Sequence, residues 1–305
     1  MSRLLIKASN PMCLLQDAGR FGVRHLGVTQ GGAADWLSMM WANWLLSNAP
    51  GAAVIEITLG GLSLIAQSDC TLALAGADLA ASVDGQALKP WRRVELKKGQ
   101  TLSFTQPLLG ARAYLAAPGG FVAPQVLGSS ATVVREQLGG PDGFGRALAI
   151  GDELNYTAEP FALRDIPLAQ QPVFTANPLL DVVLGAQIGA FSGQSTFDAF
   201  NQPWTLDSRA DRMGIRLQGP ALEYQGAPMI SEGIPLGAIQ VPPDGQPIVL
   251  LNDRQTIGGY PRLGALTPLA LARLAQCVPG ETVYLRPVTQ DAAQRQHQAF
   301  MQHFA

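Results

Sequence analysis

Short apolar runs, broken every few residues by Gly, Pro, Asp or Gln, are the feature that most constrains the fold of this chain. Runs of this length between turn-forming residues are typical of strands in barrels and sandwiches. In VIEITL (54–59) the period of two places Ile55 and Ile57 on one face and Glu56 on the other. The sequence therefore predicts a mainly β fold, with further strands at 71–74, 100–104, 111–115 and 248–251.

Three segments carry helical signals instead. DWLSMMWANWLLSN (35–48) repeats apolar residues at helical spacing behind Asp35, and it predicts an amphipathic helix whose Met and Trp side chains belong to the core. Thr267 and Pro268 predict the start of a second helix that runs to about Gln276, because Pro favours the first helical position. The tail from Thr289 predicts a third, more polar helix.

Length and a faint internal repeat predict two domains. A chain of 305 residues exceeds the size at which single cores usually stop growing. Residues 57–64 match 215–222 at four positions, and 99–104 and 280–285 both begin with a turn Gly before a strand. We expect a duplicated β domain, with an N-terminal domain at 1–170 and a C-terminal domain at 171–305. Chance similarity between β-rich segments is the alternative.

Composition narrows the class of protein. Charged residues make up 14% of the chain, against about 25% in a typical domain. So few charges suit a protein whose faces are covered by partners, although a well-buried monomer is equally compatible. The net charge of −2 argues against nucleic-acid binding. No apolar run is long enough for a membrane span, no secretory signal begins the chain, and the three cysteines form no CxxC pair, so we expect a cytoplasmic protein.

Several common motifs are missing from the sequence. It contains no GxxxxGK[ST], no GxGxxG after a strand and no GxSxG. It has three His, two of them in the tail, so we expect no metal site. No Lys has the surroundings of a biotin attachment site, and we expect no covalent biotin on this chain. If the protein uses ATP or carboxybiotin, another polypeptide is expected to bring it.

Three segments gather the polar groups that chemistry needs. Residues 15–32 place Asp17, Arg20 and His25 among five glycines, whose backbone can approach a ligand closely; structural pairing of Asp17 with an Arg is the alternative. Residues 207–217 hold three Arg and two Asp. If Arg212 and Arg216 lie on a strand, they share one face and can both bind one anion. A solvated row of charges is the alternative there.

The third segment, residues 231–264, is the most informative. A buried strand at 247–251 leads directly into Asn252-Asp253-Arg254-Gln255-Thr256 and then Gly258-Gly259-Tyr260-Pro261. Polar residues that follow a rigid apolar strand are in the usual place for a functional loop. Glu232 and Gln240 add a carboxylate and an amide nearby in the sequence.

These segments also carry a family resemblance. QDAGRFGVRHLGV (16–28), SRADRMGIRLQGP (208–220), the whole of 231–264, ALAGAD (73–78) and YLAAPGG (114–120) resemble the allophanate hydrolase subunit 2, or biotin-dependent carboxyltransferase, family. The resemblance covers nearly the whole chain. It implies tandem cyclophilin-like β-barrel domains, in agreement with the duplication. The chain departs from the pattern at 30–34 and at Glu232, which bears on the substrate more than on the fold.

The resemblance implies a function as well as a fold. The family includes the C subunit of 5-oxoprolinase, which a free-standing chain of this length resembles most. Such proteins act with a B-like subunit, related to a kinase inhibitor, and with an A-like subunit, and they use ATP to open the lactam of 5-oxoproline to L-glutamate. The alternatives are a carboxyltransferase subunit of a biotin-dependent urea or amide carboxylase, and a non-enzymatic antagonist of the kinase-inhibitor-like partner.

We expect the polar segments to supply the site residues. Cations would hold the substrate carboxylate and the transferred phosphoryl group, and carboxylates would move protons. The candidate catalytic residues are Asp17, Glu232 and Asp253, and the candidate substrate-binding residues are Arg20, His25, Glu56, Arg212, Gln240, Arg254, Gln255 and Tyr260.

Overall fold

The computed structural model describes residues 2–157, 160–162 and 164–304, which form two compact units. The N-terminal unit consists of Met1–Gly22 and Gly31–Val173, and the C-terminal unit of Val23–Gln30 and Phe174–Ala305. The short segment Val23–Gln30 therefore belongs to the C-terminal unit although the chain on both sides of it belongs to the other. Nothing in the sequence indicated this exchange.

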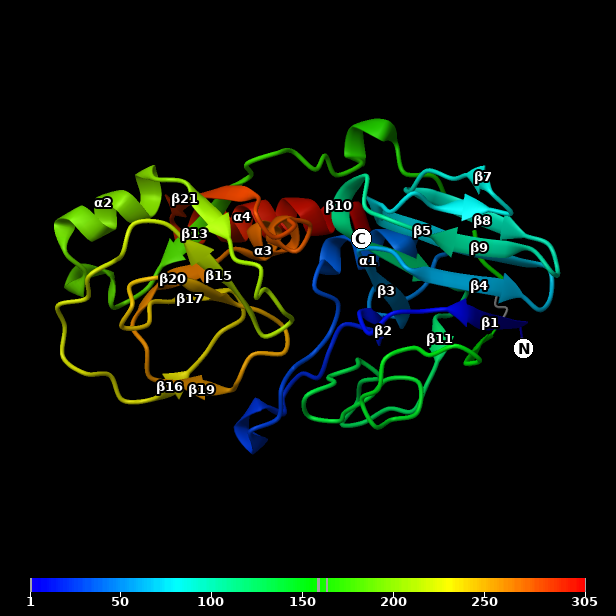
Figure 1. Cartoon of the computed structure of the whole chain (residues 1–305), viewed down its shortest axis with the longest axis horizontal. Helices are drawn as coiled ribbons and strands as arrows, with labels where there is room; N and C mark the ends of the chain where they lie inside the picture. The colour runs from blue at the N-terminus through cyan, green and yellow to red at the C-terminus, as the bar shows by residue number, and fades with distance from the viewer. Residues whose placement is uncertain (1, 158–159, 163, 305) are drawn as a thin grey trace. The chain divides into compact units, whose positions relative to one another are not determined.

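The N-terminal unit contains two antiparallel sheets (Figure 1). Most neighbouring strands are far apart in the sequence, the exception being β6 and β7, so mainly long-range pairing holds the unit together. In spatial order the first sheet is β11 (Phe121–Val122), β12 (Glu153–Tyr156), β1 (Ser2–Ala8), β4 (Leu62–Ala66), β9 (Thr101–Phe104), β6 (Ser82–Val83) and β7 (Gln86–Ala87), and the second is β2 (Cys13–Gln16), β3 (Val54–Thr58), β10 (Leu109–Ala116), β5 (Cys70–Asp78) and β8 (Arg92–Leu96).

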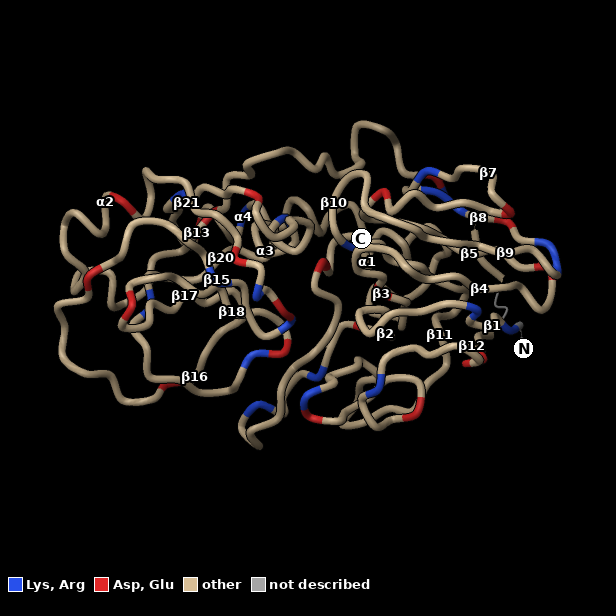
Figure 2. The backbone as a smooth tube through the Cα atoms, viewed as in Figure 1, with Lys and Arg blue, Asp and Glu red and all other residues tan. Residues whose placement is uncertain are grey.

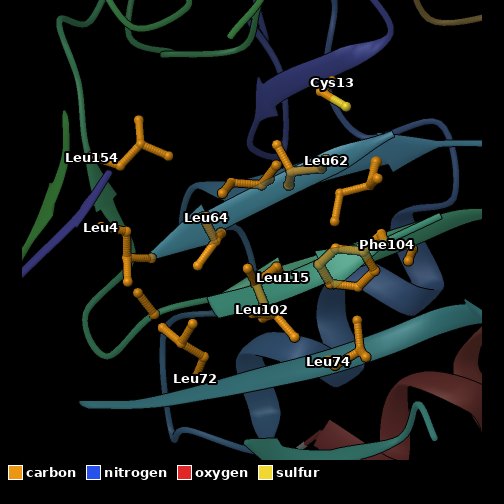
Figure 3. Close-up of a cluster of buried hydrophobic side chains, with 14 of the residues drawn as sticks. Leu4, Cys13, Leu62, Leu64, Leu72, Leu74, Leu102, Phe104, Leu115 and Leu154 are labelled. Atoms are coloured by element: carbon orange, nitrogen blue, oxygen red, sulfur yellow. The ribbon is translucent and has the colours of Figure 1, made fainter. Parts of the chain in front are cut away.

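One continuous apolar core joins the strands of these two sheets. Leu4 and Leu64 come from the first sheet and Leu74 and Leu115 from the second, and all four are buried in one cluster (Figure 3). The burial alternates in β4 but not in β3, where all five residues are buried. Both faces of β3 are therefore covered, and Glu56 lies in the interior although it faces away from Ile55 and Ile57.

The C-terminal unit contains a closed seven-stranded barrel. Parallel pairing of β13 with β21 closes it, and the other contacts are antiparallel. A separate two-stranded antiparallel sheet pairs β16 (Glu232–Gly233) with β19 (Ile257–Gly258). In barrel order the strands are β13 (Leu179–Leu184), β20 (Arg262–Leu266), β17 (Ala238–Gln240), β18 (Ile248–Leu250), β15 (Gly214–Gln218), β14 (Trp204–Leu206) and β21 (Thr282–Val288).

The expected mainly β fold with a few short helices is confirmed. The five expected strands correspond to β3, β5, β9, β10 and β18. Four α-helices are present in the described part of the chain, together with short 3-10 turns at Arg24–Leu26, Leu168–Gln170, Ile188–Ala190 and Gln302–Phe304. None of the described helices is long and apolar enough to cross a membrane.

The three expected helices are present, and one was missed. α1 (Trp36–Trp44) starts at Asp35, whose side chain accepts a hydrogen bond from Ser38 N–H. It is not amphipathic as expected, because every residue from 36 to 46 is buried or half-buried. Thr267 and Thr289 cap α3 (Pro268–Leu274) and α4 (Gln290–Met301) in the same way. The sequence did not point to α2 (Gly193–Asn201), which Ser192 caps.

The second sequence echo corresponds to one turn built twice. Gly99 and Gly280 both have φ of 88°. Their N–H groups donate to the last residues of β4 and β14, Ala66 and Leu206, and the residue after each glycine accepts a hydrogen bond from the same residue of that strand. The first echo does not fit this repeat, because residues 57–64 precede Ala66 whereas 215–222 follow Leu206.

Candidate functional site

Asp17 follows β2 and accepts four hydrogen bonds inside the N-terminal unit. One carboxylate oxygen accepts from Gly19 N–H (2.7 Å) and the Ser129 hydroxyl (2.6 Å). The other accepts from the N–H (2.7 Å) and the hydroxyl (3.0 Å) of Ser130. A carboxylate has about four acceptor positions, so the protein itself occupies all of them. This geometry gives Asp17 a structural role, since it fixes the 129–130 loop to the turn after β2.

Arg20 belongs to the same unit as Asp17 and contacts backbone carbonyl groups. Its side chain is 1% exposed, and the guanidinium group donates to the carbonyl oxygens of Val126 (3.0 Å) and Ala131 (2.7 Å). These contacts hold the loop that follows β11. The pairing of Asp17 with Arg20 that the sequence left open is not among the ion pairs of the described residues.

Glu56 holds the start of α1. It is fully buried in β3, where its carboxylate accepts from Ala34 N–H (2.8 Å) and from the Tyr114 hydroxyl (2.8 Å). The Tyr114 oxygen in turn accepts from Asp35 N–H (2.7 Å). Burial, together with the negative charges of Glu56 and Asp35, raises the pKa of Tyr114 well above its ordinary value, so this hydroxyl remains a donor. The network positions the helix inside the core.

The exchanged segment Val23–Gln30 is tied to the C-terminal unit by hydrogen bonds. The Arg24 guanidinium donates to the carbonyl oxygens of Ile234 (2.6 Å) and Thr256 (2.9 Å), and the Thr29 hydroxyl donates to Arg254 O (3.4 Å). Ile234 N–H itself donates to Thr256 O, next to the two-stranded sheet of β16 and β19. Arg24 therefore connects the motif at 16–28 with the motif at 231–264. His25 lies next to it and is exposed.

Arg212 and Asp253 form a two-pronged ion pair that joins the second and third polar segments. Nε and Nη2 of Arg212 each lie 3.0 Å from an oxygen of Asp253. Both side chains are largely buried, with exposures of 15% and 9%. The backbone reinforces the contact, because Asp253 N–H donates to Arg212 O. This fork geometry fixes both side chains at the end of β18.

Arg254 points into the protein immediately after that pair. It is 2% exposed, and it donates to Ile234 O from Nε and to Leu251 O from Nη1, both at 3.1 Å. Burial and, to a smaller extent, the charge of Arg24 lower its pKa to about 9, and the negative charge of Asp253 opposes the change. Burial also lowers the pKa of Arg24. Two guanidinium groups thus share the carbonyl oxygen of Ile234.

The other predicted site residues lie in or near strands β16, β17 and β19 in the sequence, and their side chains differ in exposed fraction. Glu232 begins β16 and pairs with Arg262, with 47% of its side chain exposed. Gln240 ends β17 and is 2% exposed. Gln255 is exposed, and Tyr260 is 46% exposed.

The structure therefore assembles part of the predicted site. His25, Arg212, Glu232, Gln240, Asp253, Arg254, Gln255 and Tyr260 belong to the C-terminal unit, and Asp17, Arg20 and Glu56 belong to the N-terminal unit. Sequence reasoning did not select Arg24, which bridges Ile234 and Thr256. Its partners lie more than 200 positions away, so no local pattern could have identified them. Its position within the 16–28 motif was the feature that could have pointed to Arg24.

The chemistry of this cluster favours anions. Arg212 binds the Asp253 carboxylate, and the guanidinium groups of Arg24 and Arg254 meet at Ile234 O. Guanidinium groups match the planar geometry of carboxylates and the oxygens of phosphates. No group of three or more His, Cys, Asp or Glu suited to a metal ion occurs among the described residues. Figure 2 shows Lys and Arg positions and Asp and Glu positions distributed along both units.

Curated relatives cover almost the full chain. It is 38% identical over 281 residues to the 5-oxoprolinase C subunit of Haemophilus influenzae, covering 92% of this chain and 89% of the relative. It is 35% identical to the 5-oxoprolinase C subunit of Escherichia coli, covering 95% and 93%. The urea amidolyase of Saccharomyces cerevisiae is 27% identical over 92% of this chain, which corresponds to 16% of that protein.

Solved structures agree with these sequence matches. The Kluyveromyces lactis urea carboxylase superposes with a TM-score of 0.92 and 25% identity over 98% of this chain, which spans 28% of that protein. The protein TTHA0988 superposes with a TM-score of 0.84 and 33% identity over 94% of this chain, which spans 56% of it. Residues 26–287 match the family described as carboxyltransferase domain, subdomain A and B, and the chain belongs to that family.

Proposed function

We propose that this chain is the C subunit of an ATP-dependent 5-oxoprolinase complex that opens the lactam of 5-oxoproline to L-glutamate. The observation that carries the proposal is the match to two 5-oxoprolinase C subunits over nearly the whole of both sequences. The chain is 38% and 35% identical to them and covers 89% and 93% of their lengths. It is 27% identical to yeast urea amidolyase and covers 16% of that protein.

The proposed complex contains two other kinds of protein and acts in the cytoplasm. One partner is a B-like subunit, related to a kinase inhibitor, and the other is an A-like subunit. ATP is a co-substrate of the complex, and this chain carries no covalent biotin. We expect the isolated chain to have no turnover.

The chemistry explains why ATP is needed. The nitrogen of a lactam donates electrons into the carbonyl, which makes the carbonyl carbon a poor electrophile. Transfer of the γ-phosphoryl group to the lactam oxygen releases ADP and removes this donation. Water then adds to the carbon, the C–N bond breaks with a proton going to the nitrogen to give an acyl phosphate of glutamate, and a second water hydrolyses that acyl phosphate to L-glutamate and inorganic phosphate. Cations near the phosphoryl group and the substrate carboxylate stabilise these steps.

The C-terminal unit offers groups for these roles. Arg212 and Arg254 are the proposed anion-binding residues, and Gln255 and Tyr260 orient polar atoms of the substrate. Glu232 is the proposed general acid or base, because its side chain is half-exposed and held by only one ion pair. Asp253 orients Arg212 through its two hydrogen bonds.

Release of glutamate and ADP from 5-oxoproline and ATP tests the proposal. The chain is purified with its candidate A-like and B-like partners, and each of the three proteins is omitted in turn. We expect turnover only when all three are present. A properly assembled complex without turnover would contradict the proposed function.

Glu232→Gln tests the assignment within the assembled complex. We expect kcat to fall by about a hundredfold or more, which is typical for loss of a general acid or base. Glu153→Gln is the matched control, because Glu153 is 51% exposed and pairs with Arg3 in a similar ion pair. Equal activity of the two variants would remove Glu232 from the mechanism.

A role as the carboxyltransferase of a biotin-dependent carboxylase is the second candidate. The family description and the TM-score of 0.92 with a urea carboxylase favour it. In that reaction the same cations would hold carboxybiotin and an amide acceptor. Activity that depends on a biotinylated partner and that avidin blocks would favour this candidate over the first.

A further inference from the structure

Two guanidinium groups of the C-terminal unit share one carbonyl oxygen. Arg24 Nη2 lies 2.6 Å from Ile234 O, and Arg254 Nε lies 3.1 Å from the same atom. Like charges this close repel each other, and the repulsion is stronger where burial excludes water. Since Arg254 is 2% exposed, the protein maintains this repulsion in a place where solvent screens it poorly.

No carboxylate of the described residues forms an ion pair with either of these two groups. The nearest negative charge that affects Arg254 is Asp253, and Arg212 already binds both oxygens of that carboxylate. Glu232, the first residue of β16, forms an ion pair with Arg262. The excess of positive charge at this place is therefore not balanced by the acidic residues beside it.

Two donors beside the two-stranded sheet of β16 and β19 have no acceptor among the described residues. Nη1 of Arg24 and Nε2 of Gln240 are both buried and make no hydrogen bond. Gln240 Nε2 lies beside Gly258, since a Cβ added to that glycine would lie 2.9 Å from this nitrogen and 2.7 Å from the Ile234 side chain. A buried donor without a partner costs about 1–3 kcal/mol. An added acceptor would offset that cost.

We propose that Arg24, Arg254 and Gln240 form a binding site for a small oxyanion, a carboxylate or a phosphate group, beside the two-stranded sheet of β16 and β19. Such an anion supplies both the charge and the acceptor oxygens that these side chains lack. The carboxylate source rests on the proposed function, because 5-oxoproline carries one carboxylate. The phosphate source is independent of that substrate.

Calorimetric titration distinguishes the two sources. The full chain and the assembled complex are titrated with 5-oxoproline, with its neutral carboxamide and with inorganic phosphate, at an ionic strength held constant with sodium chloride. Binding of 5-oxoproline but not of the carboxamide identifies a carboxylate site, and binding of phosphate alone identifies a phosphate site. Absence of binding by both anions, in the chain and in the complex, overturns the proposal.

Three variants separate binding from folding. Arg24→Ala should weaken anion binding by about ten- to a hundredfold, because a hydrogen bond to a charged group contributes about 1.5–3 kcal/mol. Gln240→Leu removes a donor that has no partner, so it should weaken binding while leaving the thermal midpoint equal or higher. Arg295→Ala removes the same charge from an exposed ion pair of α4 and should leave binding unchanged.

The outcomes also separate this site from the proposed function. If Arg24→Ala and Arg295→Ala bind the anions equally, the site is wrong even if the complex releases glutamate. If the anions bind as expected but the assembled complex releases no glutamate, the site stands and the 5-oxoprolinase assignment fails. A purely structural Gln240 is recognised by unchanged binding in Gln240→Leu.

Discussion

At the residue scale, neighbouring polar residues of the 16–28 motif have different tasks because different parts of the chain reach them. Asp17 binds Ser129 and Ser130, more than 110 positions away, and Arg24 binds Ile234 and Thr256, more than 200 positions away. The sequence could show that carboxylates and guanidinium groups are concentrated here. It could not show which of them the fold would occupy, because the partners are Ser hydroxyls and backbone carbonyls that carry no local signal.

Asp17→Asn tests the structural role of that carboxylate. One carboxylate oxygen becomes an NH2 group that faces two donors and can accept from neither, so we expect the free energy of unfolding to fall by about 1–3 kcal/mol. Thermal unfolding followed by circular dichroism measures the change. Asp165→Asn is the control in the same unit, because Asp165 is 88% exposed and pairs only with Arg93 at 3.3 Å. Equal midpoints for the two variants would contradict the structural role.

At the element scale, turns and caps were the most predictable features and burial was the least. Asp35, Thr267 and Thr289 each begin a helix at the expected residue, because a cap is a local contact. Whether an element is covered on one face or on all sides depends on the rest of the fold. That is why α1 was expected to be amphipathic and is instead surrounded, and why Glu56 in β3 lies in the interior.

The repeated turn predicts equal effects of two distant mutations. Gly99 and Gly280 share φ of 88°, and a Cβ added at either would enter open space, so Ala at either place meets only backbone strain. We expect Gly99→Ala and Gly280→Ala each to lower the free energy of unfolding by about 1–2 kcal/mol. Gly189→Ala, also in open space but without a positive φ, should have a smaller effect. Denaturant unfolding of the three variants checks this, and clearly unequal penalties would argue against a shared turn.

The hairpin of β14 and β15 is expected to weaken in acid through Asp207. Hydrogen bonds from Arg209 and, more weakly, from Gln218 lower the pKa of Asp207 below its ordinary value. A carboxylate with a lowered pKa stabilises the fold above its unfolded pKa of about 3.9, and this contribution is lost as the pH falls below that value. The midpoint difference between the wild type and Asp207→Asn should therefore shrink between pH 7 and pH 3. Hydrogen exchange of β14 should show the same trend, and a constant difference would exclude it.

At the scale of the whole molecule, the two units are connected three times by the chain, at Gly22–Val23, at Gln30–Gly31 and at Val173–Phe174. A two-domain protein with one linker would be connected once. Length and composition indicated two β-rich halves, but a segment of eight residues that changes units leaves no trace in periodicity or composition. It is visible only through its hydrogen bonds, those of Arg24 and Thr29 above all.

Separate expression of fragments 1–173 and 174–305 tests the exchange. The second fragment lacks residues 23–30, so we expect it to bind the first fragment, which carries them. Arg24→Ala in the first fragment should weaken the association by about tenfold or more, because two hydrogen bonds from a charged group are lost. Arg3→Ala, which removes an exposed ion pair, is the control. Equal affinity of both variants would show that the segment does not contribute.

The exchanged segment also limits how the two units can be separated by gene recombination. A gene cut between Val173 and Phe174 would separate the C-terminal unit from eight of its own residues, so that unit cannot be moved into another protein intact. Recombination that moves the complete C-terminal unit must carry the N-terminal unit with it. The relatives follow this rule, since matches to proteins of very different length, from a free-standing 5-oxoprolinase component to a urea amidolyase of which this chain is 16%, each span at least 90% of the chain.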